Sequence, residues 1–146
     1  MPSISRASCC TGVVDSPGVQ PSAADAAGWL AKAEEDLAVA QLLVQSASPV
    51  RWAACFHSQQ AAEKAIKSRL VLAGVDFPRS HALGRLVALL PEGMQSRFDE
   101  EALAVLEPWA TAGRYPEDID EPDASTATRI VATAVHIVDG ARSLQP

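Results

Sequence analysis

Aromatic residues and positive charge are both scarce in this sequence. Only 5% of the 146 residues are aromatic, and 12 Lys and Arg stand against 18 Asp and Glu, which gives a formal net charge of −6. Proteins that bind nucleic acid without selectivity present a positive field, and those that hold single strands stack the bases on aromatic side chains. The composition therefore argues against general nucleic-acid binding, although it permits a local basic site.

Cysteines and long apolar runs are also few. Cys9 and Cys10 are adjacent and Cys55 lies alone, which matches neither a disulfide framework nor a zinc site. No stretch approaches the ~18 apolar residues that span a membrane, and no run of signal-peptide length follows Arg6. The acidic segment 117–123 lacks the Gly and the ligand order of a calcium loop. We therefore expect a cytoplasmic protein with no membrane contact, no metal and no cofactor.

The residues that are present suffice for one folded domain. Hydrophobic residues make up 48% of the chain, which is enough to bury a core at this length. Residues 1–21 show no hydrophobic period, so we expect a disordered tail there and a folded domain over residues 22–146.

Apolar residues spaced three and four apart predict an all-α fold of about five helices. The first helix is expected to begin after an N-cap at Ser22 and to end near Gln45. The second is expected to begin at a cap formed by Ser48 and to run to about Ala73, where Gly74 ends it.

The remaining helices are shorter or interrupted. A third begins at Ser80, a fourth ends at Gly113, and the last begins near Asp123. Pro108 lies inside the fourth helix and predicts a kink or break near residues 104–107. Because the connections are short, neighbouring helices should run antiparallel, as in an up-and-down bundle with a four-helix core.

The most informative pattern lies in the second predicted helix. One face carries polar residues at steps of three, four and three: His57, Gln60, Lys64 and Lys67. Two ammonium groups, an amide and an imidazole in one row suit a phosphate beside a base or a ribose. The alternative interpretation is an ordinary solvated face on which Glu63 and Lys67 form an i,i+4 ion pair.

Two other segments carry anion-binding chemistry. Arg114 and Tyr115 follow a predicted helix end, where the guanidinium either points toward the polar row of the second helix or only complements the helix dipole. His81 follows Ser80 at a helix start, an arrangement that suits an anion or forms only a local cap.

Arg129 and His136 stand seven residues apart and nearly in line on the last helix. A His can act as general base on a 2′-hydroxyl while an Arg stabilises the phosphorane, so this pair is a candidate for RNA cleavage. The alternative is a half-exposed Arg and a His beside the core, a pair that arises easily by chance.

Three strings of this chain resemble the HEPN family of helical bundles: FHSQQAAEKAIKSRL, SHALGRL and TAGRYPED. The resemblance covers roughly residues 28–144. It implies a bundle that dimerises, in a prokaryotic setting, often beside a minimal nucleotidyltransferase. One branch of the family cleaves RNA without metal, through an Arg followed by four to six residues and a His. The other branch binds nucleotides or a partner protein.

The sequence departs from the cleaving branch. The spacing from Arg129 to His136 is permitted, but Ile130 occupies a position that is typically polar. Apolar Ile137 and Val138 follow the His, where that branch carries further polar residues. The residues that match the binding branch are Gln60, Glu63, Lys64, Lys67, His81, Arg114 and Tyr115.

We therefore predict a non-catalytic HEPN-like homodimer that binds a nucleotide or serves a nucleotidyltransferase partner, within a toxin–antitoxin-type pair. In this hypothesis phosphate is contacted by Lys64, Lys67 and Arg114. The ligand is oriented by His57, Gln60 and His81, and Tyr115 packs the loop. A metal-independent endoribonuclease that cuts RNA with Arg129 and His136 is the alternative, and a structural interaction module is the third hypothesis.

Overall fold

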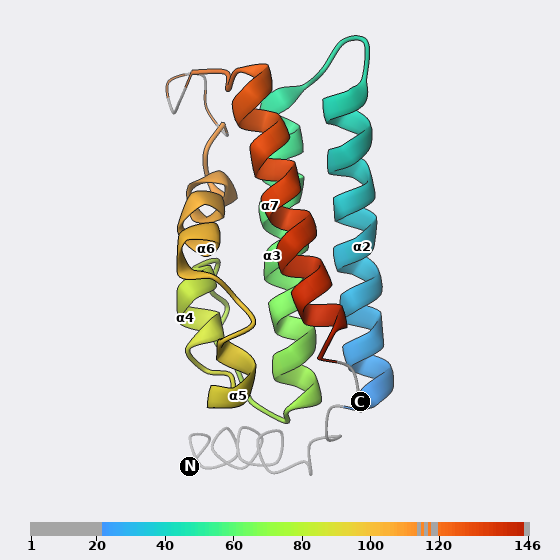
Figure 1. Ribbon diagram of the computed structural model, residues 1–146, viewed down its shortest axis with the longest axis vertical. Helices are drawn as coiled ribbons and strands as arrows, with labels where there is room; N and C mark the ends of the chain where they lie inside the picture. The colour runs from blue at the N-terminus through green and yellow to red at the C-terminus, as the bar shows by residue number, and fades with distance from the viewer. Residues whose placement is uncertain (1–21, 114, 116, 118–119, 145–146) are drawn as a thin grey trace, which may run out of the picture.

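The computed structural model describes residues 22–113, 115, 117 and 120–144, and every regular element in this part of the chain is helical. Three long helices, α2 (Ala23–Gln45), α3 (Arg51–Leu72) and α7 (Ala124–Arg142), stand side by side (Figure 1). A layer of short elements flanks them: α4 (Leu83–Val87), α5 (Glu92–Gln95), α6 (Glu100–Leu106) and the 3-10 turn η1 (Glu107–Ala110). The prediction of an all-α bundle is confirmed. The tail expected over residues 1–21 lies outside the described residues.

Local hydrogen bonds fix two of the predicted helix ends. The Asp25 N–H donates to Ser22 Oγ at 3.2 Å and the Ser22 N–H donates to Asp25 Oδ2 at 2.8 Å, which is a complete capping box at the start of α2. At the end of α3, Gly74 has a φ of +69°, and the Val75 N–H donates to the Leu70 carbonyl at 2.9 Å. Both ends agree with the sequence prediction.

The predicted cap at Ser48 is wrong. Helix α3 begins at Arg51, after Val50, and no side chain within the segment caps it. The Arg51 N–H donates instead to Glu121 Oε1, at 3.1 Å, from a loop 70 residues away in the sequence. A distant carboxylate replaces the local hydroxyl, and no local pattern could have indicated it.

Pro108 interrupts the predicted fourth helix where it was expected to. The chain leaves the α-helical path after Leu106 and continues as the 3-10 turn η1, because proline offers no N–H for the helical ladder. Phe98 precedes α6 and is buried.

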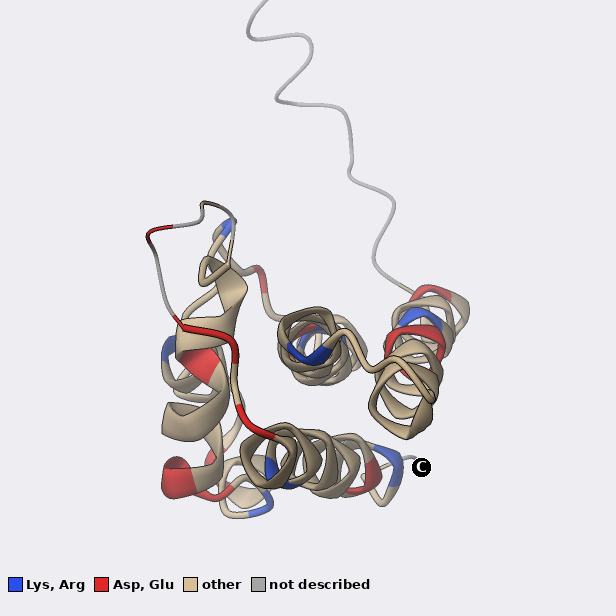
Figure 2. Ribbon diagram, turned by 90° about the horizontal axis from the view of Figure 1, so that it is seen from above, with Lys and Arg blue, Asp and Glu red and all other residues tan. Residues whose placement is uncertain are grey.

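Helix α3 is the central element of the bundle. Figure 2 shows α2, α7 and the layer of short helices around it on three sides. Four of its alanines have no exposed surface, which allows neighbouring helices to approach closely: Ala54, Ala61, Ala62 and Ala65. The remaining side of α3, which we call the open side, faces no other helix of the described chain.

Candidate functional site

Asp36 of α2 joins two members of the polar row of α3. His57 Nδ1 lies 2.9 Å from Asp36 Oδ1, and Lys64 Nζ makes a short salt bridge to Asp36 Oδ2. His57 and Lys64 are both half-buried. Because one carboxylate holds both side chains, His57 and Lys64 are positioned together at the junction of α2 and α3.

Glu63 organises the other members. Its carboxylate accepts hydrogen bonds from Lys67 Nζ at 2.7 Å and Gln59 Nε2 at 3.1 Å, and His81 Nδ1 lies 2.9 Å from it. Glu63 itself is only 4% exposed. Burial alone raises the pKa of Glu63, but the hydrogen bonds from Lys67, His81 and Gln59 outweigh burial and hold the pKa below its ordinary value. Glu63 is therefore an ionised carboxylate inside the fold.

Lys67 does not lie on a solvated face. Its side chain is buried, and its ammonium group lies 5.7 Å from the ring centroid of Trp29 and 5.6 Å from that of Phe77. The two rings meet edge to face at 6.1 Å. Lys67 was expected to contact phosphate, but the loop after α3 folds back and places Phe77 over it, so its ammonium group is less accessible than on a solvated face. Its charge is already neutralised by Glu63.

A pocket of about 410 Å³ lies beside this network, between α2 and α3. Its lining is formed by Ala24, Asp25, Gly28, Trp29, Lys32 and Lys64. On one flank of α2, Asp36 reaches Lys64, and on the other flank Glu34 pairs with Arg142 of α7 at 2.8 Å. The pocket therefore opens on the open side of α3, away from α7.

Trp29 and Lys32 were not identified in the sequence as site residues. They lie three residues apart, so they share a flank of α2, and an indole next to a lysine on one flank is a usable signal. The stronger apolar period of α2 marks a neighbouring, buried stripe instead, namely Leu30, Ala33, Leu37 and Ala40.

The other predicted binding residues that the structure describes do not line the α2–α3 pocket. Gln60 donates to Gln59 Oε1 at 2.7 Å and so extends the Glu63 network. The imidazole of His81 is attached to the same network, and more than half of its surface is exposed. Tyr115 is exposed, in the loop before α7. Arg114 lies outside the described residues.

Arg129 and His136 meet in a second pocket, of about 420 Å³, between α6 and α7. Both side chains are exposed. The complete lining is Asp99, Glu101, Ala102, Val105, Arg129, Ala132, Thr133 and His136. Since α7 is not on the open side of α3 (Figure 2), this α6–α7 pocket is separate from the α2–α3 pocket.

Comparison with known proteins assigns the fold to a family. The family model of the HEPN domain matches residues 26–144. The chain belongs to the HEPN domain family. Two solved structures are similar to it. TT1696 from Thermus thermophilus is 28% identical, with a TM-score of 0.69 over 81% of this chain and 96% of that one. ST0689, an archaeal HEPN homologue, is 26% identical, with a TM-score of 0.63 over 81% and 95% of the two chains. No match was found among curated proteins.

The HEPN assignment confirms the resemblance carried by the second helix and by the segments after it. The family includes both binding and RNA-cleaving members, so membership does not decide between these two functions. The residues that line the two pockets are the basis for choosing between them. Among the described residues, no group of three His, Cys, Asp or Glu side chains is placed to hold a metal ion. Within the same part of the chain, no helix combines the length and the apolar character needed to cross a bilayer.

Proposed function

We propose that this HEPN protein binds a nucleotide in the α2–α3 pocket and does not itself catalyse a reaction. The observation that carries the proposal is the lining of the pocket, which brings the Trp29 indole together with the ammonium groups of Lys32 and Lys64. An aromatic ring stacks on a base, at about 1–3 kcal/mol for each base, and ammonium groups hold phosphate.

The charges in the pocket orient the nucleotide. Asp25 repels phosphate, so the phosphate end lies toward Lys32 and Lys64. The base or ribose end lies toward Asp25, because a carboxylate accepts hydrogen bonds from hydroxyl and amino groups. Both lysines are paired in the free protein, Lys32 with Glu35 at 2.8 Å and Lys64 with Asp36. A bound phosphate therefore competes with these carboxylates, which favours modest affinity.

The hydrogen-bond network around Glu63 and Asp36 positions the residues that line the pocket and does not itself contact the ligand. Glu63 holds Lys67, which lies against the Trp29 ring, and His57 fixes Asp36, which in turn fixes Lys64. In this proposal His57, Gln60, Glu63, Lys67 and His81 act as positioning residues. The nucleotide itself contacts Trp29, Lys32 and Lys64.

We further propose that the protein acts as a homodimer and as the partner of a nucleotidyltransferase, in a toxin–antitoxin-type pair. Membership of the HEPN family supports this proposal, since the resemblance noted in the sequence implies such pairing. A neighbouring nucleotidyltransferase gene, and co-purification of its product with this chain, would support it. A gene without such a neighbour, and a chain that purifies alone from its own cell, would contradict it.

RNA cleavage is the second candidate, because Arg129 and His136 line the same pocket. The proposed roles are general base for His136 and phosphorane stabilisation for Arg129. Asp99 and Glu101 line that pocket as well, and two carboxylates repel a phosphodiester. Because of this repulsion, we regard RNA cleavage as the weaker of the two candidate functions.

Titration calorimetry with AMP and ATP as probes tests the first candidate. We expect Trp29→Leu to weaken binding at least tenfold, as the loss of about 1.4 kcal/mol of stacking predicts, and Lys32→Gln to weaken it in the same direction. The matched control is Arg97→Gln, which removes an exposed cation outside this pocket. Binding that is unchanged in Trp29→Leu, or no binding of either probe, would refute the site.

The second candidate is tested by incubating the wild type and His136→Ala with mixed RNA in a chelator. We expect no cleavage by either protein. Cleavage by the wild type that is lost in His136→Ala would replace nucleotide binding with the endoribonuclease function.

A further inference from the structure

The α6–α7 pocket carries charges of both signs, and Arg129 also interacts electrostatically with Asp123 outside it. Its ionisable lining consists of Asp99, Glu101, Arg129 and His136. Within the described chain, none of these four side chains makes a hydrogen bond or a salt bridge. The α2–α3 pocket differs, because both of its lysines are already paired with carboxylates. The volume of about 420 Å³ is in the range of small-molecule sites.

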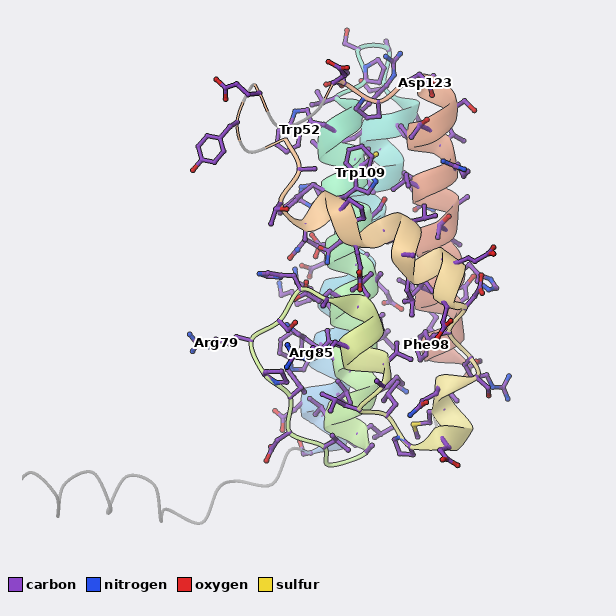
Figure 3. The ribbon with its side chains drawn as sticks, turned by 90° about the vertical axis from the view of Figure 1, so that its left-hand side faces the viewer. Trp52, Arg79, Arg85, Phe98, Trp109 and Asp123 are labelled. Carbon is purple, nitrogen blue, oxygen red and sulfur yellow. The ribbon has the colours of Figure 1, made fainter. Side chains whose placement is uncertain are left out.

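The two helices separate these charges along the pocket. Figure 3 shows α6 lying across α7. The start of α6 lies beside the second half of α7, because a Cβ at Gly140 would come within 3.1 Å of the Arg97 carbonyl oxygen, and Figure 3 shows Phe98 at this end. Asp99 and Glu101 therefore lie at the His136 end of the pocket. Arg129 lies about two turns earlier on α7 than His136, away from this end.

The middle of the pocket is mostly apolar. Ala102 and Val105 of α6 face Ala132 and Thr133 of α7 across it. The Thr133 hydroxyl donates to the Arg129 carbonyl at 2.8 Å, so toward the pocket it presents its methyl group and an accepting oxygen. A ligand that suits this lining is cationic at one end, anionic at the other and aliphatic between.

We propose that the α6–α7 pocket binds a dipeptide-sized zwitterion, with its ammonium group at Asp99 and Glu101 and its carboxylate at Arg129. The seven residues from Arg129 to His136 rise by about 10.5 Å along a helix. Two extended residues span about 7 Å, and the side chains at the two ends reach over the remainder. A single amino acid is too short to contact both ends. This inference concerns a different pocket from the nucleotide proposal and does not depend on it.

Termini that can be blocked chemically make the proposal testable. The probe is the dipeptide Ala-Leu in its free form, its N-acetylated form and its C-amidated form, titrated into the full chain by calorimetry or followed by NMR shifts of α6 and α7. We expect the free dipeptide to bind and each blocked form to bind at least tenfold more weakly. Arg129→Gln should weaken the free form to the level of the amide, and should leave the affinity for the amide unchanged.

A double variant tests the acidic end of the pocket. Asp99→Asn with Glu101→Gln should reduce the affinity for the free dipeptide to that of the N-acetylated form; Asp99 makes no side-chain cap bond that the change would break. Arg85→Gln, on α4 and outside this pocket, is the control and should change nothing. Equal binding of free and blocked dipeptides would overturn the proposal. So would no binding at millimolar concentration in protein whose helical circular dichroism is intact.

Discussion

Glu63 accepts hydrogen bonds from both Gln59 and Lys67 and contacts His81, although it is almost fully buried. Removing one partner of a buried ion pair is strongly destabilising because the other charge is left without compensation. We therefore expect Glu63→Ala to lower the free energy of unfolding by about 3–5 kcal/mol in urea titrations. Glu35→Ala, which breaks an exposed pair with Lys32, is the control and should change stability little. A small effect of Glu63→Ala would show that Lys67 and His81 find other partners.

The same carboxylate predicts a pH dependence. The pKa of Glu63 is lower in the folded chain than its ordinary value, so the unfolded state binds the proton more readily. The stabilisation by Glu63 is therefore fully present above the unfolded-state pKa and is lost as the pH falls through the folded-state value. Melting temperatures between pH 7 and pH 3 should fall less steeply in Glu63→Gln than in the wild type. Parallel curves would contradict this role.

Cys55 is expected to be chemically inert in the native protein. Its side chain is fully buried, and burial, with a smaller contribution from Glu121, raises the pKa of its thiol to about 12. The reactive thiolate is then almost absent at pH 8. In a variant with Cys9→Ser and Cys10→Ser, a disulfide reagent should detect no thiol until denaturant is added. Rapid labelling without denaturant would show that the core around Cys55 opens easily.

At the scale of elements, Gly74 and Gly113 both follow helical segments, but they differ in the space available for a side chain. Gly74 and Gly113 both have positive φ, +69° and +80°, which side chains adopt at a cost of roughly 1–2 kcal/mol. A Cβ at Gly74 meets nothing within 4 Å, whereas a Cβ at Gly113 would lie 2.9 Å from an atom of the Trp52 ring. Trp52, near the start of α3, and Trp109 lie at the same end of the bundle (Figure 3).

The two alanine variants therefore separate backbone strain from contact. We expect Gly74→Ala to lower the free energy of unfolding by about 1 kcal/mol, and Gly113→Ala to lower it by clearly more. In Gly113→Ala the near-ultraviolet circular dichroism should also change, because the Trp52 ring has to move. Equal losses in the two variants would show that Trp52 shifts without resistance.

Helix ends were predictable from the sequence where they are fixed by residues close in the sequence. The capping box at Ser22 and the exit at Gly74 depend on residues within one turn, and both were predicted. The start of α3 was misplaced because its cap, Glu121, comes from a distant loop. In the same way, the burial of Lys67 depends on Phe77 folding back across the open side of α3. Contacts between distant segments have no periodic signature, and so the site was less predictable than the fold.

At the scale of the whole molecule, the bundle keeps its two candidate pockets apart. The α2–α3 pocket lies on the open side of α3, and the α6–α7 pocket lies next to α7, which covers another side (Figure 2). Ligands in the two pockets therefore would not touch. An effect transmitted through the packed helices, from α2 or α3 to α7, would be needed to couple them.

We expect the chain to assemble as a homodimer. The four alanines of α3 named above are fully buried inside the bundle and are not available for an interface. The outer side of α2 instead exposes Val39 at 37% and Leu42 at 71%. Burying large aliphatic side chains is favourable, at roughly 1.5–3 kcal/mol for a fully buried Leu.

Sedimentation equilibrium at micromolar concentration tests this assembly. The wild type should give twice the mass of the 15.4 kDa chain, and Leu42→Lys should shift it toward the monomer, because a charged ammonium group then has to be desolvated at the interface. Leu89→Lys is the matched control, since Leu89 is an exposed leucine at 38% that lies after α4, outside α2, and it should leave the mass unchanged. A monomeric wild type would remove the dimer. A dimer that dissociates in Leu89→Lys but not in Leu42→Lys would move the interface from α2 to the layer of short helices.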